Sequence, residues 1–278
     1  MDVERALQII VADAERGNMV FPTHAELALS VKRMLDDPEC AVEPLTRLIA
    51  AEPLLASRVV AMANSVVYNR SGRRSADLRG AVSRLGFNTL RTLTMAIVIG
   101  QMANMVRDPT HRALAARLWE HSVHVAALAR VIASRVTRQD PETAFFAGIV
   151  HEIGGFYLIA RAAAFPGLLE SDLAAWVGER EAQVGRFVLH ALDIPENVMN
   201  ALEVLWSGYL AMPAASLGDT LLLADYLAPV ESPLAELTGM GRRGMAAEIE
   251  QQVDGAELSA ILADSADEVA ALIASLKG

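Results

Sequence analysis

Apolar residues recur every three or four positions along most of this chain, and this spacing places them on one face of an α-helix. Leu27, Val31 and Met34 form one such series, and residues 55–62 carry another. Alternation with a period of two is rare. Apolar residues make up 53% of the chain but aromatics only 5%, so the core must consist mostly of the aliphatic residues that packed helices use. The sequence therefore predicts an all-α protein.

Capping residues indicate where several helices begin and end. Residues 23–26 read Thr-His-Ala-Glu, which is a capping box. Asp77 can cap a helix that Gly86 closes in the left-handed conformation, and Asp140 followed by Pro141 marks another start. We expect further helices at 90–105, 111–136, 173–192, 196–205 and 215–227, a surface loop at 231–244, and one long amphipathic helix at 258–276.

Several motifs, in this order along the chain, resemble the HDOD domain family. They lie at residues 46–55, 60–65, 81–91, 119–122, 147–154 and 223–225. The resemblance implies an all-α, HD-like multi-helix fold whose members are regarded as signalling modules, often without demonstrated enzyme activity. The expected organisation is an N-terminal helix (1–20), an HDOD domain (21–228) made of an N-terminal helical subdomain (21–107) and an HD-like subdomain (111–228), and a C-terminal loop and amphipathic helix (229–278).

Charge and composition exclude several other classes. A net charge of −10 disfavours nucleic-acid binding, which needs a basic face, and the arginines near residue 70 are interpreted as solvated loop charges. Cys40 is the only cysteine, so neither a disulfide framework nor a thiolate metal cluster is expected. The N-terminus lacks an apolar signal segment, and residues 92–106 are too short to span a bilayer. We therefore expect a soluble cytoplasmic protein that does not insert into membranes.

The resemblance also implies a candidate metal site. HD phosphohydrolases hold a divalent metal with a histidine on one helix, an adjacent His-Asp pair on a second and a distant aspartate on a third. Imidazole and carboxylate ligands suit Mn, Fe, Zn or Ni. The matching positions here are His121, His151, Glu152 and Asp225, with His124 and His190 as additional candidate ligands.

Three departures from the family pattern argue against catalysis, and no catalytic residue is predicted. Glu152 replaces the usual aspartate, and the extra methylene moves the carboxylate by more than the tolerance of a metal site. Gly155 stands where related cyclic-dinucleotide phosphodiesterases carry a lysine. Trp206 follows Leu205 where many members of the family have two histidines, which indicates a filled pocket.

The leading hypothesis is a non-catalytic regulatory module that binds a partner protein or a small ligand. In this interpretation His121 and Glu152 hydrogen-bond each other and hold two helices in register. The alternative is a metal-dependent phosphohydrolase acting on a nucleotide or cyclic dinucleotide. The C-terminal helix is expected to pack on its own chain, with a homodimer contact as the other option.

Overall fold

Every regular element in the part of the chain that the structure describes is a helix, as the apolar spacing predicts. The computed structural model describes residues 3–16, 18, 21, 25–75, 77–106, 108–165, 168–169, 178–211, 213–238 and 255–277. The α-helices are α1 (Val3–Glu15), α2 (Glu26–Asp36), α3 (Val42–Ala50), α4 (Pro53–Ala63), α5 (Leu78–Asn104), α6 (Pro109–Ile132), α7 (Pro141–Val150), α8 (Ile153–Arg161), α9 (Glu179–Ala191), α10 (Glu196–Ser207), α11 (Leu217–Leu227), α12 (Pro233–Thr238), α14 (Gly255–Asp264) and α15 (Ala266–Lys277).

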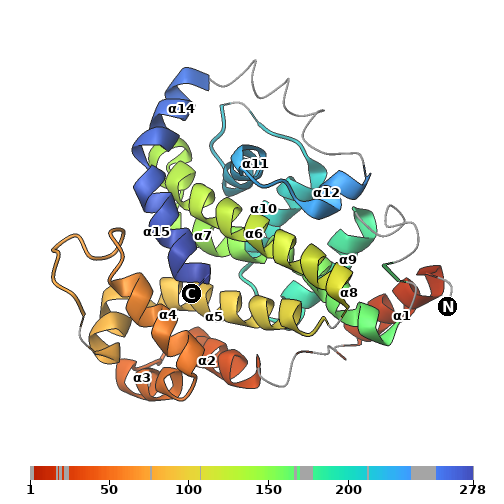
Figure 1. Ribbon diagram of the computed structural model, residues 1–278, viewed down its shortest axis with the longest axis horizontal. Coiled ribbons are helices and arrows are strands. Elements are labelled where there is room, and N and C mark those ends of the chain that lie inside the picture. The colour runs from red at the N-terminus through yellow and green to blue at the C-terminus, as the bar shows by residue number, and fades with distance from the viewer. Residues whose placement is uncertain are drawn as a thin grey trace.

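Helix α6 crosses the middle of the molecule and packs against α7, α11 and α15 (Figure 1). Asp108 begins it by accepting hydrogen bonds from the Thr110 and His111 amides. Gly148 of α7 lies against the α6 backbone, and a Cβ atom at that position would lie 2.5 Å from the Ala126 Cα atom. The absence of a side chain at Gly148 therefore allows α6 and α7 to approach closely.

Helix α5 connects the N-terminal helices to the rest of the molecule. It packs against α2, α3 and α4 on one side and against α7 and α8 on the other. Gly86 interrupts it with a φ of +72°, so the predicted helix end at this glycine is confirmed and a second helix follows directly. Most of the second half is buried. The boundary between subdomains near residues 107–111 stays a prediction.

Helices α7 and α8 place His151 and Glu152 inside the protein. Asp140 accepts a hydrogen bond from the Thr143 amide and Pro141 is the first helical residue, as predicted. The segment Pro141–Arg161 is long and apolar enough to cross a membrane by length and composition, but 89% of its most apolar window is buried in the protein. This burial is typical of a core helix, and the turn between α7 and α8 lies within that core.

One predicted element differs from the structure, and two others fall partly outside the described residues. Helix α9 begins at Glu179, and the first part of the helix predicted at 173–192 lies outside the described residues. The capping box at residues 23–26 also falls largely outside them; α2 begins after Ala25, which makes no side-chain cap. The segment predicted as a loop at 231–244 contains α12, whose first turn packs against α6.

The C-terminal segment forms two helices instead of the single one predicted. They meet at Ser265, whose hydroxyl donates a hydrogen bond to the Ile261 carbonyl in the preceding turn. Helix α15 packs against α6 and α4, with Leu272 and Leu276 fully buried. The expectation that this segment covers its own chain is confirmed for α15.

Candidate metal centre

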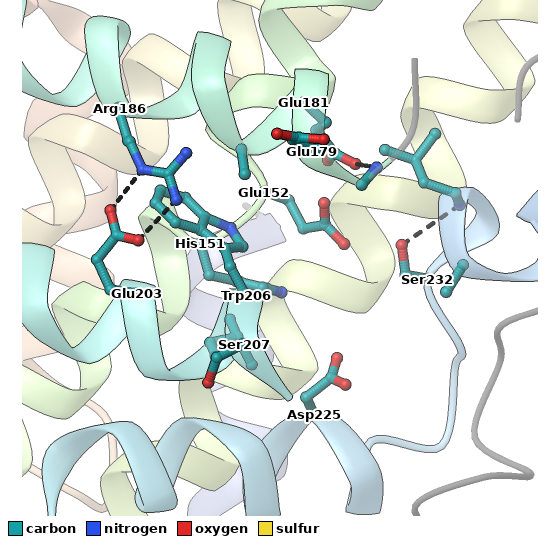
Figure 2. Close-up of a pocket in the computed structure, with 15 residues that line it drawn as sticks. His151, Glu152, Glu179, Glu181, Arg186, Glu203, Trp206, Ser207, Asp225 and Ser232 are labelled. Atoms are coloured by element: carbon teal, nitrogen blue, oxygen red, sulfur yellow. Dashed lines mark hydrogen bonds and ion pairs between the residues drawn. The ribbon is translucent and has the colours of Figure 1, made fainter. Parts of the chain in front are cut away.

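Four residues that are far apart in the sequence meet beside α6. His121 comes from α6, His151 and Glu152 from the turn between α7 and α8, and Asp225 from α11. The His121 Nε2 atom lies 3.1 Å from His151 Nε2, 3.1 Å from Asp225 Oδ1 and 3.8 Å from Glu152 Oε1. Figure 2 shows His151, Glu152 and Asp225 bordering one space. The structure thus brings together all four residues that the resemblance singled out.

Backbone carbonyls fix the orientation of both histidine rings. The Nδ1–H group of His121 donates a hydrogen bond to the Val230 carbonyl at 2.8 Å, and that of His151 donates to the Gly148 carbonyl at 2.7 Å. A carbonyl oxygen only accepts hydrogen bonds, so each Nδ1 must carry a hydrogen atom. The two Nε2 atoms are left facing each other, which is the arrangement found in metal-binding histidines.

Two imidazole lone pairs cannot face each other at this distance without a cation between or beside them. In the absence of a metal, a proton on His121 Nε2 can act as this cation, because both His151 Nε2 and the Asp225 carboxylate can accept a hydrogen bond from it. Burial lowers the pKa of His121, but the hydrogen bond and charge of Asp225 and the charge of Glu152 outweigh it and raise that pKa. Burial, aided by the neighbouring His121, lowers the pKa of His151. The two pKa shifts have opposite directions, so a proton on the pair is favoured on His121 over His151.

The donors of His121, His151 and Glu152 also lie close enough together to bind a divalent transition metal. Two nitrogen ligands about 2.1 Å from one ion lie roughly 3.0–3.4 Å apart when they occupy neighbouring positions, and the two Nε2 atoms are 3.1 Å apart. The ligand atoms of His121, His151 and Glu152 all lie within 4.8 Å of one another. The expected hydrogen bond between His121 and Glu152 does not form at 3.8 Å; His121 pairs instead with His151 and Asp225.

The two additional histidines lie apart from this set. His124 uses Nδ1 to donate a hydrogen bond to the Glu120 carbonyl on its own helix, at 2.7 Å. His190 is exposed at the end of α9. Neither is among the described residues whose ligand atoms converge, so their proposed role as ligands stays a prediction.

A pocket of about 560 Å³ opens beside His151. Its described lining contains a single basic side chain, that of Arg186. Arg186 donates two hydrogen bonds to Glu203, at 2.5 and 2.6 Å, and stacks over Trp206 with 4.9 Å between its Cζ atom and the ring centre. Figure 2 shows this pair at one side of the pocket. The acidic lining residues are Glu152, Glu179, Glu181, Glu203 and Asp225.

Carboxylates crowd one wall of this pocket strongly enough to perturb their protonation. Burial and the neighbouring carboxylate of Glu152 raise the pKa of Glu181 well above its ordinary value. Five carboxyl groups therefore line the pocket, and burial favours the neutral form of one of them, Glu181; sequence inspection gave no sign of this cluster. Glu179 and Glu181 lie on α9, far from the His-Glu pair in the sequence, and they have no counterpart in the motif.

The surroundings of Gly155 and the position of Trp206 clarify two of the departures from the family pattern. A Cβ atom at Gly155 would lie 2.4 Å from Leu234 Cδ1 and 2.9 Å from Glu181 Oε1, so the Leu234 and Glu181 side chains would have to move to admit a side chain there. Leu234, at the start of α12, is fully buried. Trp206 lines one wall and leaves the cavity open, which corrects the interpretation that it fills the pocket.

An all-helical domain with an HD-like cluster of histidines and carboxylates is the class that these features define. The model of the HDOD domain matches residues 21–206, which is more than half of the chain. The chain therefore belongs to the HDOD domain family. No curated protein is similar enough to count as a match.

Solved structures from several bacteria share the fold. A candidate metal-dependent phosphohydrolase from Shewanella amazonensis SB2B is 20% identical with a TM-score of 0.72, and the alignment covers 99% of both chains. An HDOD domain protein of unknown function from Geobacter sulfurreducens is 22% identical with a TM-score of 0.63, again over 99% of both chains. A candidate signal transduction protein from Marinobacter aquaeolei VT8 is 18% identical with a TM-score of 0.55, over 99% of this chain and 66% of that one.

Proposed function

We propose that this chain is a regulatory HDOD protein that acts by binding a partner and does not hydrolyse phosphoesters. The observation that carries the proposal is the charge of the pocket beside the histidine pair. Five carboxyl groups line it, although burial favours the neutral form of Glu181, and its one described guanidinium is held by Glu203. A phosphoester is an anion whose transition state needs positive groups around it. This lining repels such a substrate.

In this proposal the cluster of His121, His151, Glu152 and Asp225 is a structural link. A cation between the two Nε2 atoms, either a proton or a divalent metal, ties α6 to the turn between α7 and α8 and to α11. A metal bound there would acidify a coordinated water and neutralise phosphoryl charge. The residues of this chain hold the cation and orient the two rings through the Val230 and Gly148 carbonyls.

Family membership and one neighbour support the regulatory part. The Marinobacter protein that shares the fold is named as a candidate signal transduction protein, and a scaffold without a working site would act through its surface. The convergence of a His-His-carboxylate set favours the alternative, a metal-dependent phosphohydrolase, like the Shewanella neighbour. The two functions differ in whether the pocket takes up phosphate.

Titration calorimetry with protein purified without affinity-metal resin and then loaded with Mn²⁺ tests this difference. Inorganic phosphate and a cyclic dinucleotide are the ligands, and His151→Ala and His190→Ala are the site variant and its control. We expect no saturable binding of either ligand in the millimolar range. Micromolar binding that His151→Ala abolishes and His190→Ala preserves would contradict the proposal.

A further inference from the structure

Helix α4 is apolar on two sides, although only one of them faces the core. Leu55, Val59 and Met62 are fully buried. On the outer side, Ala56, Val60 and Ala61 line a groove of about 690 Å³. An apolar helix surface directed away from its own core is a candidate for contact with a partner.

Small side chains make up part of the groove lining. Ala56, Ser57 and Ala61 line it together with Leu78 and Arg74. Large apolar side chains extend this surface on either side: Leu54 is 44% exposed and Val66 is 65% exposed. Small residues at a helix surface let the ridge of another helix approach closely.

The segment after α4 adds positive charge beside the groove. We call residues 65–75 the arginine loop; it projects at the left of Figure 1. Arg70, Arg73 and Arg74 are exposed, and their guanidinium groups have no partner among the described residues. Two nearby carboxylates are already engaged: Glu43 pairs with Arg79 at 3.3 Å and Asp77 accepts a hydrogen bond from the Gly80 amide. This is a local positive patch on a chain of net charge −10.

The arginine loop is held in a defined position. The Asn64 side chain exchanges two hydrogen bonds with the Ser75 backbone, at 2.7 and 3.2 Å. Arg84 donates to the Ala63 and Arg73 carbonyls, both at 2.9 Å, and so joins the two ends of the loop. A surface that is already ordered loses little conformational entropy when a partner binds.

We propose that the α4 groove and the arginine loop bind an amphipathic helix of a partner protein that carries Asp and Glu beside its apolar face. The groove accepts the bulky apolar ridge, and the three guanidinium groups pair with the carboxylates. A groove lined by alanines fits a helix better than a lipid layer, which takes protruding aromatic and leucine side chains. This inference rests on the proposed partner-binding role and locates the surface that performs it.

Selection from a displayed library of random helical peptides against the full chain tests the proposal. The selected peptides are then titrated by fluorescence anisotropy against wild type, Ala61→Glu, and Arg70→Glu/Arg74→Glu. The charge-matched control is Arg16→Glu/Arg112→Glu, which changes exposed arginines on other parts of the surface. Circular dichroism verifies that each variant is folded, and sedimentation with phosphatidylglycerol vesicles tests for lipid binding.

We expect enriched peptides with Asp and Glu beside apolar residues at positions i, i+4 and i+7. Either groove variant should weaken their binding about tenfold or more, and the control should not. No enrichment, enrichment without acidic bias, or equal binding by the groove variants would overturn the proposal. Vesicle binding that depends on Arg70 and Arg74 would also overturn it in favour of a lipid surface. The phosphate titration is independent of these results, so the two proposals fail separately.

Discussion

His121 and His151 show how buried polar groups dictate one another's protonation. Each Nδ1 is committed to a carbonyl, and the two Nε2 atoms lie 3.1 Å apart, so the pair requires one additional positive charge. Asp225 and Glu152 balance that charge. Because removing one member of a buried charged set leaves the others uncompensated, the pair should contribute to stability whether it holds a proton or a metal.

We expect His151→Ala to lower the free energy of unfolding by about 2–4 kcal/mol, since it removes the buried ring that faces His121 Nε2 and leaves a cavity in its place. The same variant should lose the uptake of Mn²⁺ or Zn²⁺. His190→Ala, at an exposed position, should stay within about 0.5 kcal/mol of wild type and keep metal uptake. Urea denaturation and elemental analysis measure the two effects. Equal stability and equal metal content in both variants would contradict the structural link.

Asp219 supplies a pH dependence that is independent of the metal site. Burial alone would raise the pKa of its carboxyl, but hydrogen bonds from the Ser216 hydroxyl and from the Ser216, Ala211 and Ala215 amides lower it. The folded pKa thus lies below the unfolded value of about 3.9. The stabilisation is complete above that value and is lost as the pH falls through the folded pKa.

Asp219→Asn should therefore cost about 1–3 kcal/mol near neutral pH and make the loss of stability in acid shallower. Urea denaturation at a series of pH values measures this slope, with the exposed Asp193→Asn as a control. If the variant kept the wild-type slope below about pH 5, the carboxylate would not be the group responsible.

From the sequence, only the four motif residues of the candidate site could be predicted. His121, His151, Glu152 and Asp225 were identified together because the resemblance supplies their order. The groups that orient these four side chains and close the site come from positions that no sequence motif marks. The carbonyls of Val230 and Gly148 are backbone atoms, and Leu234 reaches Gly155 only through the tertiary fold.

Two helices can pack very closely where a glycine, which has no side chain, lies at the contact. Gly148 lies against the α6 backbone, where a methyl group would be 2.5 Å from the Ala126 Cα atom, whereas Gly100 in α5 has open space in the corresponding direction. Gly148→Ala should therefore destabilise the protein by about 2–3 kcal/mol or more, because backbone cannot move aside easily. Gly100→Ala should be neutral or stabilising by up to about 1 kcal/mol. Thermal unfolding of both variants distinguishes close packing from a general preference for glycine.

Helix type and most boundaries followed from periodicity and caps, because these signals are local. Asp77, Gly86 and Asp140 all act where the sequence predicts. The C-terminal segment departed from prediction because its apolar pattern continues through Ser265, although the helix is interrupted there. The contacts that α15 makes with α6 and α4 are tertiary, and a local pattern does not contain them.

Arg130 joins distant parts of the whole molecule. From α6 it donates to Glu142 of α7 at 2.9 and 3.1 Å and to Glu268 of α15 at 2.6 Å, and it stacks over the Tyr68 ring. Glu142 also accepts hydrogen bonds from Tyr68 and Thr89, both at 2.8 Å. Burial and the charge of Glu142 raise the pKa of Tyr68, so its hydroxyl stays a donor. This network connects the arginine loop to the core and the C-terminal helix.

Arg130→Met should lower the free energy of unfolding by about 3 kcal/mol, because two carboxylates lose their buried counter-charge. Arg135→Met, which removes a more exposed guanidinium 3.7 Å from Glu268, should cost less than about 1 kcal/mol. Chemical denaturation measures both variants. A loss of stability as large in Arg135→Met as in Arg130→Met would show that surface charge, and not the network, governs the effect.

The rate of phosphodiester hydrolysis by the metal-loaded protein tests the non-catalytic role most directly. Bis(p-nitrophenyl) phosphate and a cyclic dinucleotide serve as substrates, with Mn²⁺ supplied and His151→Ala assayed in parallel. An acidic pocket that repels phosphate predicts equal, background rates for wild type and variant. A wild-type rate well above background that disappears in His151→Ala would contradict this role and establish a working phosphohydrolase.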